Sequence, residues 1–518
     1  MTENPRYDVV IVGYGPAGAI AACWLGQAGI KTLVVEKNRA IWEIPRAVAL
    51  DHEILRVFQN IGIVDRVLPY TAPFGASEHF GAQGQLIRRI DVVPPPYPLG
   101  YLPNMVFTQP QVETVIRNRV AELVSVTVKL GCEVTGLVDE QDGAVVSIQD
   151  DAGNRSSIPT RFVIACDGAS STIRRLLQIP FEDLGFDEPW LVVDVLVNDD
   201  ALHNLPTVCA QYCDPERPST YIIGPGNHRR WEIMLNVGDD PREVEREERV
   251  WQLLSRWLEP SQGRLWRASS YRFHALVAQR WRVRRVFLAG DAAHQQPPFI
   301  GQGMCQGVRD VTNLCWKMIS VLSGQSAESL LDTYEQERKQ HVTTLTQRIK
   351  QIGAAICIRD PEAARERDEG LLKQGGGKAP VVTRQEIVPP LEAGLVRLDL
   401  GHGAGTIFPQ PRVLGPGGSA LIDELEGSGW QLIVDGRRAA ESPGPDCSGI
   451  QSVLLGGKGL QEVEGVAAAW FDAHQCSAAI VRPDHYVYCG ITALHTANQL
   501  WCALRNAMRA EPMASETN

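Results

Sequence analysis

The feature that most constrains this chain is a glycine-rich turn between a strand and a helix near its start. Residues 7–12 (YDVVIV) form an apolar run typical of a strand buried in a parallel sheet. The sequence GYGPAG follows at residues 13–18, and the pattern predicts a helix over residues 19–28. A second buried strand is expected at residues 32–35. Together these segments predict a β-α-β unit of the dinucleotide-binding kind.

Three glycines and one acid in this unit suit a pyrophosphate and a ribose. Gly13 permits a tight turn, Gly15 lets the backbone approach a pyrophosphate, and Gly18 lets helix and strand pack closely. The helix N-terminus offers free N–H groups and partial positive charge. Glu36 ends the second strand, where a carboxylate can accept ribose hydroxyls. The acid favours FAD or NAD over NADP; a glycine-rich turn without a ligand is the alternative.

Two aspartates are expected at the ends of other strands. Asp167 lies in CDGASS, where it either caps the following helix or contacts a ligand. Asp291 lies in AGDAAH, ahead of two prolines and the sequence GQGM at residues 301–304. Those glycines let the backbone approach a flat ligand, and a helix starting near Met304 would point its N-terminus at a ring that becomes anionic, such as reduced flavin. A surface loop is the alternative.

In this order the three motifs resemble those of the single-component flavoprotein aromatic hydroxylases, the group of the para-hydroxybenzoate and phenol hydroxylases. The resemblance covers about residues 6–350. Within the group the chain is most similar to 3-(3-hydroxyphenyl)propionate hydroxylases, through PRA at 45–47, QPQV at 109–112 and RRWE at 229–232. The residues expected to contact FAD are Gly13, Gly15, Pro16, Ala17, Gly18, Glu36, Lys37, Arg46, Gln109, Asp167, Gly168, Gly290, Asp291, Pro298, Gly301, Gly303, Met304 and Cys305.

The expected fold class is α/β with α+β elements, and the length suggests two to three domains. We expect a Rossmann-like FAD-binding domain at residues 1–185 and 275–358, with a second sheet domain over the flavin at 186–274. The resemblance implies a small thioredoxin-like domain at 390–505, redox-inert because it lacks C-x-x-C. Charged residues followed by three glycines at 359–380 indicate a linker or a mobile surface segment.

Composition narrows the expected partners. The chain has 50 basic and 61 acidic residues, a net charge of −11, which argues against nucleic acid or an anionic membrane. Without an apolar window of about 20 residues or a secretory signal, the sequence favours a cytoplasmic protein. The twelve cysteines form no C-x-x-C, so we expect free thiols and no metal. A homodimer is a candidate assembly, and the sequence leaves the oligomeric state open.

The resemblance implies an NAD(P)H-dependent monooxygenase. NADH or NADPH would reduce FAD, dioxygen would add to give a flavin C4a-hydroperoxide, and a phenol would attack its distal oxygen. The expected substrate is a phenolic aromatic acid of the 3-hydroxyphenylpropionate type, in aromatic compound catabolism. One alternative is epoxidation, Baeyer–Villiger oxidation or halogenation of a larger ring system on the same scaffold. Another is a non-catalytic FAD-binding protein.

The sequence offers only candidates for the groups that would handle the substrate. Such a phenol needs a proton acceptor, and a substrate carboxylate needs a cationic partner. Each candidate could instead be a packing or surface residue. The candidate proton acceptors are His52, Asp51 and Tyr221, with Tyr101 and Tyr271 behind them. The candidate carboxylate partners are Arg230 and Arg272.

Overall fold

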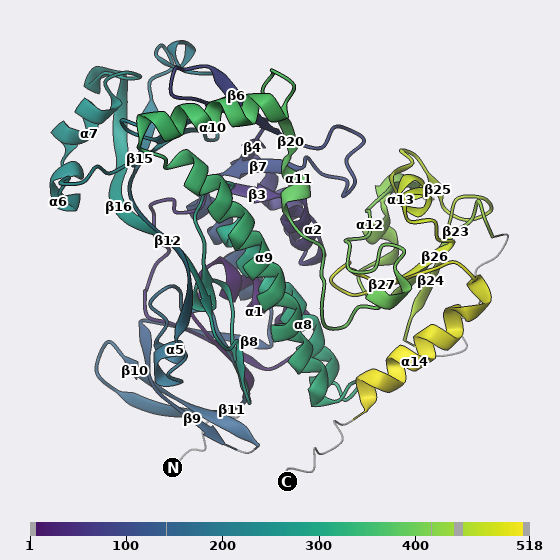
Figure 1. The fold of residues 1–518 in the computed structure, drawn as a ribbon. Helices are drawn as coiled ribbons and strands as arrows, with labels where there is room; N and C mark the ends of the chain where they lie inside the picture. The colour runs from purple at the N-terminus through teal and green to yellow at the C-terminus, as the bar shows by residue number, and fades with distance from the viewer. Residues whose placement is uncertain (1–6, 141, 416, 440–448, 511–518) are drawn as a thin grey trace, which may run out of the picture.

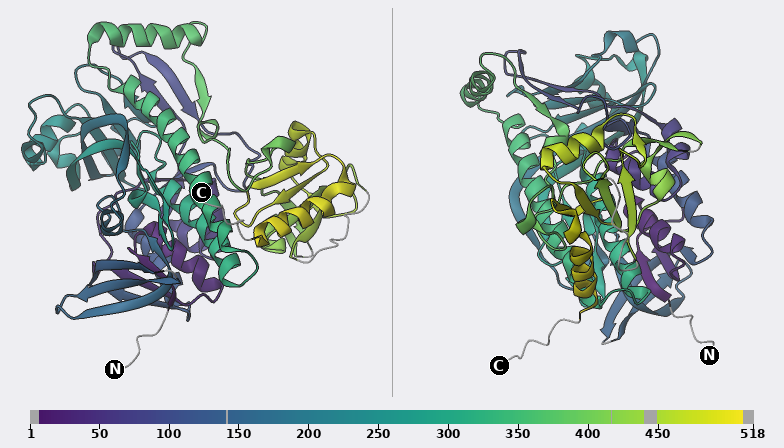
Figure 2. Two further views of the ribbon diagram at one scale, coloured as in Figure 1. Left: turned by 60° about the horizontal axis from the view of Figure 1, so that its bottom comes forward. Right: turned by 90° about the vertical axis from the view of Figure 1, so that its right-hand side faces the viewer.

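The computed structural model describes residues 7–140, 142–415, 417–439 and 449–510. Within these residues the chain builds an eight-stranded sheet, a nine-stranded sheet and, near the C-terminus, a four-stranded sheet in a separate lobe (Figures 1 and 2). A three-stranded sheet, β3-β7-β4, comes from the part of the chain between β2 and β8. Its strands are Ala49–Asp51, Asn104–Phe107 and Thr71–Pro73. No described helix is long and apolar enough to cross a membrane.

The eight-stranded sheet contains the predicted β-α-β unit. Its parallel strands run in the order β18-β11-β1-β2-β8, and the β9–β10 hairpin extends β11. Because β1, β11 and β18 are parallel neighbours, the turns that follow them meet at one edge of the sheet, where ligands bind in such folds. The strands are β1 Tyr7–Val12, β2 Thr32–Glu36, β8 Val126–Leu130, β9 Cys132–Glu140, β10 Gly143–Asp150, β11 Arg155–Ala165, β17 Arg282–Val283 and β18 Val286–Leu288.

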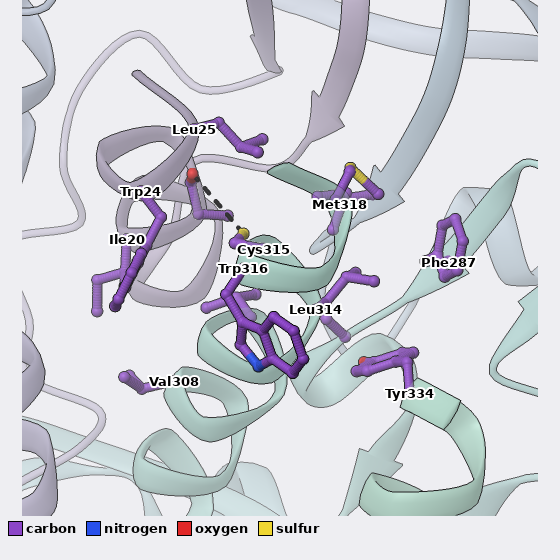
Figure 3. Packing of buried hydrophobic residues seen from close by; sticks show 14 of the residues in the cluster. Ile20, Trp24, Leu25, Phe287, Val308, Leu314, Cys315, Trp316, Met318 and Tyr334 are labelled. Atoms are coloured by element: carbon purple, nitrogen blue, oxygen red, sulfur yellow. Dashed lines mark hydrogen bonds between the residues drawn. The ribbon is translucent and has the colours of Figure 1, made fainter. Parts of the chain in front are cut away.

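Two helices pack closely beside this sheet. Helix α1 (Pro16–Gln27) and helix α8 (Gly303–Leu322) interlock through small and apolar side chains, and Cys315 Sγ lies 3.9 Å from the Ala21 carbonyl oxygen (Figure 3). The glycine turn precedes α1 and the GQGM segment begins α8, so this packing fixes the two helix N-termini relative to each other. Other helices here are α2 His52–Asn60, α3 Val64–Val67, α4 Gln109–Ala121, α5 Thr172–Leu176 and α9 Asp332–Ile356.

The nine-stranded sheet draws on more of the chain than residues 186–274. Its order is β19-β16-β12-β15-β14-β13-β5-β6-β20. The antiparallel pair of β12 (Phe181–Val197) and β16 (Gly263–Ala278) forms its longest part. The remaining strands are β5 Ser77–Phe80, β6 Leu86–Asp91, β13 Cys209–Tyr212, β14 Ser219–Ile223, β15 His228–Met234, β19 His294–Gln295 and β20 Val381–Thr383.

The two faces of this sheet differ in chemistry. On the outer face, Val193, Tyr221 and Trp231 join an apolar cluster covered by helices α6 (Pro241–Val244) and α7 (Glu247–Leu254) (Figure 1). Side chains that alternate with these point to the other face, because successive residues of a strand face opposite sides. This inner face carries polar groups at paired positions. They are Asp194, Arg230, Thr220, Glu232, Gln211 and His79.

Residues 359–380, for which we expected a linker or a mobile surface segment, form a helix over most of their length. Helix α10 (Pro361–Gln374) is N-capped by Asp360, whose carboxylate accepts hydrogen bonds from two backbone N–H groups. Asp368 accepts from the backbone N–H of Ala82 at 2.8 Å, which ties the helix to β6 and its turn. The charges that indicated a linker thus include a helix cap and a buried hydrogen-bond acceptor.

The C-terminal lobe has the strand order β24-β23-β26-β27. Strand β23 is parallel to β24 and antiparallel to β26, and β26–β27 is a hairpin, in keeping with the expected thioredoxin-like arrangement. Cys502 is disulfide-bonded, unlike the expected set of free thiols. The elements after β20 are α11 Arg384–Ile387, β21 Arg412–Gly415, β22 Gly418–Leu421, α12 Ile422–Glu426, β23 Gln431–Asp435, β24 Gln451–Leu455, β25 Gln461–Glu462, α13 Val466–His474, β26 Ala478–Val481, β27 Val487–Ile491 and α14 Ala497–Arg509.

Candidate flavin and substrate site

The glycine turn after β1 leaves space at one glycine only. A Cβ on Gly13, where φ is +97°, would lie 2.3 Å from the Cys166 carbonyl oxygen, and one on Gly18 would lie 2.1 Å from the Gly13 carbonyl oxygen. Packing therefore requires both glycines. Nothing lies within 4 Å of a Cβ built on Gly15, so the space in front of Pro16 and Ala17 at the start of α1 is open to a ligand.

Glu36 lies beside this turn. Its Oε2 accepts a hydrogen bond from the Tyr14 backbone N–H at 2.8 Å, and its Oε1 accepts two from Asn38 at 2.8 Å. The side chain is 8% exposed, at the end of β2, while Lys37 next to it is exposed. The backbone thus orients the carboxylate at the place where a ribose would follow a pyrophosphate.

The loop that carries Arg46 is held by the FAD-side domain and by the nine-stranded sheet. Gln109 Oε1 accepts hydrogen bonds from the backbone N–H groups of Arg46 and Ala47, both at 2.8 Å. Arg230, on the inner face of the sheet, donates to the Arg46 carbonyl at 2.7 Å and the Pro45 carbonyl at 3.0 Å. These bonds place the inner face directly against the Arg46 loop and leave the Arg46 side chain exposed.

Asp167 caps a helix through one carboxylate oxygen, and its other oxygen leaves the alternative ligand role open. Its Oδ2 accepts from the backbone N–H groups of Thr172 at 2.7 Å and Ile173 at 3.1 Å, which caps α5. Its Oδ1 is buried and has no hydrogen-bond partner among the described residues. A buried carboxylate oxygen without a partner is costly, so this atom suits a ligand that donates a hydrogen bond. Gly168 follows with φ of +80° and open space around it.

Asp291 lies in a loop that is held in place by hydrogen bonds to the buried Asp310 of α8. Asp310 accepts hydrogen bonds from the Gly290 backbone N–H at 3.0 Å and from His294 Nε2 at 2.7 Å. Arg338 donates to the same carboxylate at 2.9 Å. The Asp291 side chain is accessible to solvent, yet the surrounding protein raises the pKa of its carboxyl by burial. It is therefore a rigidly supported acceptor.

The GQGM segment turns into α8 at the same edge. The Gly301 N–H donates to the Pro298 carbonyl at 2.8 Å, and a Cβ on Gly301 would lie 2.8 Å from the Ala49 Cβ. Gly303 begins the helix with nothing within 4 Å of its Cβ position. Met304 is partly exposed, whereas Cys305 is fully buried. The open positions at the start of α8 can face a flat ring.

These residues fit FAD. The open space at Gly15 suits the pyrophosphate, with Glu36 beside it for a ribose. The unpartnered Oδ1 of Asp167 suits a hydroxyl or other donor group of the bound molecule. Asp291 and the start of α8 lie farther along the same sheet edge, for the ribityl chain and the isoalloxazine ring.

Asp51 is occupied by structural contacts. Its Oδ1 caps α2 through the Ile54 N–H, and its Oδ2 accepts from Gln302 at 3.0 Å and Arg309 at 2.6 Å. Burial acts to raise its pKa, but the Arg309 guanidinium outweighs burial and holds the pKa of Asp51 below its usual value. An ionised carboxylate with these partners orients its neighbours and has little capacity left for a substrate proton.

His52 has a free ring nitrogen. Its side chain is 8% exposed, and its buried Nδ1 has no partner among the described residues. Burial lowers the pKa of His52 to about 4; Asp51 opposes this effect and Arg309 adds to it. The imidazole is therefore neutral near neutral pH and keeps an acceptor nitrogen, so His52 stays a candidate proton acceptor.

Tyr221 points away from the other candidates. It lies opposite Trp231 in the β14–β15 pair, with ring centroids 5.3 Å apart, in the outer cluster under α7. Arg230, which contacts the Arg46 loop, faces the other side of the sheet. The structure thus corrects the choice of Tyr221. Tyr101 also lies elsewhere, donating to Gln59 at 2.8 Å.

Neither arginine chosen for a substrate carboxylate is available. Arg230 pairs with Asp194 at 2.7 Å besides holding the Arg46 loop. Arg272 is exposed and pairs with Asp187 at 2.7 Å on the surface. Tyr271 is 41% exposed and stacks beside Arg267, which also approaches Asp194.

Two side chains with unsatisfied charge were missed. Glu232 is 4% exposed on the inner face, and burial raises its pKa to about 7, against the lowering effect of Arg230. Arg384, in α11, is 3% exposed. The alternation of RRWE along a strand could have placed Glu232 beside Arg230. No local pattern marks Arg384, which follows the segment that had been taken for a linker.

The C-terminal lobe contacts the helix that carries His52. Arg56 pairs with Asp423 through hydrogen bonds of 2.7 and 2.9 Å, both side chains being buried. Glu53 accepts from Arg309 at 2.6 Å and from the Tyr486 hydroxyl at 3.2 Å. The lobe is therefore linked to α2 and, through Arg309, to Asp51.

Comparison with known proteins agrees with this geometry. Residues 6–349 match the family described as FAD binding domain. The chain is 34% identical to a probable NADH-specific resorcinol 4-hydroxylase of Rhodococcus jostii (strain RHA1), over 93% of this chain and 91% of that protein. It is 31% identical to a 3-(3-hydroxy-phenyl)propionate/3-hydroxycinnamic acid hydroxylase of Klebsiella pneumoniae (strain 342), with the same coverage.

Solved structures share the fold. The flavin-dependent monooxygenase PieE, in complex with FAD and substrate, superposes with a TM-score of 0.81 at 19% identity, over 97% of this chain and 99% of that one. The p-nitrophenol 4-monooxygenase PnpA of Pseudomonas putida DLL-E4 has a TM-score of 0.65 at 26% identity, over 71% of this chain and 94% of that one. The chain belongs to the FAD-binding-domain family and is a single-component FAD-dependent aromatic hydroxylase.

Proposed function

We propose that this enzyme uses NADH and dioxygen to hydroxylate a small phenolic compound bound between the flavin and the inner face of the nine-stranded sheet. One observation carries the proposal: Arg230 on that face donates hydrogen bonds to the carbonyls of the Arg46 loop, so the face lies over the expected flavin site. The polar inner face and the apolar residues beside it suit a ring that bears hydroxyl groups.

The protein's own contribution is binding, orientation and charge. Bound FAD would take electrons from NADH and supply the chemistry that activates dioxygen. Gly15, Asp167 and Asp291 would hold the cofactor, while the N-terminus of α8 offers positive charge to a ring that becomes anionic on reduction. The nine-stranded sheet would limit access of water to the reacting atoms.

A phenol becomes a better nucleophile as it loses its proton, and two residues could accept that proton. Glu232 has a pKa near 7 and lies on the inner face, so its two protonation states interconvert near neutral pH. His52 stays neutral and has a free Nδ1. We propose Glu232 first, because its carboxylate lies two residues from Arg230, on the same face.

The relatives support the finer choices. A resorcinol hydroxylase described as NADH-specific and hydroxyphenylpropionate hydroxylases both act on phenols with a meta substituent, as their names state. We therefore propose NADH as the reductant and a meta-substituted phenol, neutral or bearing a short acidic chain, as the substrate. We also propose a cytoplasmic enzyme, since its reductant is intracellular, and keep a homodimer as the candidate assembly.

The test is NADH oxidation by the purified holoenzyme with resorcinol, 3-(3-hydroxyphenyl)propionate and no phenol. We expect one phenol class to stimulate NADH oxidation and to gain one oxygen atom by product mass, with little hydrogen peroxide released. NADPH should serve less well. Equal rates with and without every phenol, or stimulation only by large fused rings, would contradict the proposal.

A further inference from the structure

A buried arginine without a counter-ion lies next to the expected flavin face. Resting on the proposed function, we propose that Arg384 binds an anionic oxygen of the aromatic substrate, either a side-chain carboxylate or the phenolate. The experiment below distinguishes the carboxylate from the phenolate. Arg384 is the binding residue in both cases.

Arg384 is buried without an acid. Its side chain is 3% exposed, and no described Asp or Glu forms an ion pair with it. Burial lowers the pKa of its guanidinium to about 10, and only the Cys209 thiol opposes this. An unpaired charge away from water is destabilising, so a protein that keeps one gains from a ligand of opposite charge.

Neutral groups hold the guanidinium in place. Nη1 donates to the Ile300 carbonyl at 3.0 Å. Nε donates to the Asn104 side-chain oxygen at 2.8 Å in the amide orientation that also satisfies the Asn104 nitrogen. The Phe74 ring centroid lies 4.6 Å from Cζ. Two donors and one face are thus fixed without any negative charge, which leaves the other N–H groups for an oxyanion.

The surroundings of Arg384 are apolar. Phe74 belongs to an apolar cluster with Ala49 and Cys209, against which the partly exposed Ile222 of β14 packs. Ile300 precedes Gly301, whose Cβ position touches Ala49. Arg384 therefore lies between the loop that begins α8 and the inner face of the sheet, where the substrate is expected.

The local charge is positive. Burial, together with Arg88, Arg384 and Arg367, lowers the pKa of His79 well below its usual value, so His79 adds no charge. Arg88 contacts His79 at 3.2 Å, and Arg367 is already paired with Asp368 at 2.7 Å. On the inner face, Asp194 is occupied by Arg230, whereas Glu232 forms no ion pair among the described residues. A substrate anion would meet Arg384 with no carboxylate in competition on the guanidinium.

The experiment titrates the FAD-loaded enzyme with a matched pair of ligands and follows the flavin absorption spectrum. The pair is 3-(3-hydroxyphenyl)propionate and the corresponding primary alcohol, with resorcinol as a third ligand. The variants are Arg384→Met and Arg384→Lys, and Arg272→Met is the control because that arginine is exposed. The pH dependence of bound-phenol absorbance reports ionisation of the phenol.

If Arg384 binds the carboxylate, Arg384→Met raises the Kd of the acid by about tenfold to a hundredfold and that of the alcohol by less than about threefold. If it binds the phenolate, all three ligands weaken together and the bound phenol ionises at higher pH. Arg384→Lys should keep part of the wild-type affinity in either case, because it keeps a positive charge. Arg272→Met should bind all three ligands as the wild type does. Wild-type affinities and ionisation in an FAD-loaded Arg384→Met enzyme would overturn the proposal.

The wild-type enzyme supplies a second test, in case Arg384→Met fails to fold. It should bind the acid at least about tenfold more tightly than the alcohol, or lower the pKa of the bound phenol. If it does neither, the proposal is overturned. These titrations need no turnover, so a failure of phenol-stimulated NADH oxidation would count against the proposed function separately.

Discussion

The two faces of the nine-stranded sheet are built by the same strands and do different work. Trp231 and Glu232 are neighbours in β15, yet Trp231 lies in the outer cluster under α7 and Glu232 faces the expected substrate. The outer face is apolar and stabilises the fold by burial. The inner face carries charges that cost stability unless they are paired. Apolar packing and the charged groups of the inner face thus alternate from one residue to the next along the strand.

The largest effect on stability is expected at Asp194, because its ion pairs hold buried charges of the inner face in place. It pairs with Arg230 and His228, both at 2.7 Å. Asp194→Ala should cost about 5 kcal/mol in the free energy of unfolding, because it leaves a buried arginine uncompensated. Burial acts to raise the pKa of Asp194, but Arg230 and His228 hold it at about 2. Its stabilisation is therefore complete above about pH 4 and lost as pH falls towards 2.

Denaturant unfolding of the wild type and Asp194→Ala at several pH values would measure this. The difference between them should shrink in acid. A variant as stable as the wild type at neutral pH would show that the inner-face charges are not structural.

Trp231→Ala tests the outer face. Trp231 is fully buried, and truncating a buried aromatic side chain costs about 3–5 kcal/mol. The folded fraction should still bind FAD and the substrate with wild-type affinity, because the ring points away from the site. Chemical denaturation measures the loss of stability, and titration of the flavin and substrate measures the affinity of the folded protein. If the free energy of substrate binding fell by more than the free energy of unfolding, the outer face would also contribute to the site.

Glu232→Gln, at the next residue, should show the opposite pattern. A pKa raised from 4.5 to about 7 means that the ionised carboxylate costs roughly 3 kcal/mol of stability above pH 7, a cost that falls away as pH drops to 4.5. The glutamine variant should therefore be more stable than the wild type at pH 8 and equal to it near pH 4.5. Stopped-flow substrate oxidation should lose the pH step near 7; an unchanged profile would remove Glu232 as the proton acceptor.

The smallest effect is expected for Tyr221→Phe. The Tyr221 hydroxyl is buried and has no close hydrogen-bond partner among the described residues. Removing it should change the free energy of unfolding by less than about 1 kcal/mol and leave kcat and KM as they are. Steady-state kinetics test this expectation. A drop in kcat of a hundredfold or more would show that Tyr221 contributes to catalysis after all.

Sequence reasoning predicted the glycine turn because part of its geometry is local. Gly18 is required by a contact with the Gly13 carbonyl oxygen five residues earlier, and a spacing pattern captures such a contact. The contact of Gly13 with Cys166, which follows the neighbouring strand β11, could not be predicted from the spacing. The substrate side was predicted less well because its geometry depends on register. Nothing in the order of residues says that Tyr221 pairs with Trp231, or that Asp194 occupies Arg230. The position of Arg384 was still harder to predict. It directly follows β20, which pairs with β6, a strand almost 300 residues earlier in the sequence.

The buried pair of Arg56 and Asp423 limits how this enzyme can change. If the C-terminal lobe were exchanged for that of a relative, Arg56 in α2 would be left buried without a counter-ion unless the new lobe also supplied an acid at the same place. The same applies to Tyr486 and its hydrogen bond with Glu53. A chimera that joins a foreign lobe to this chain at residue 390 should therefore include compensating changes on α2.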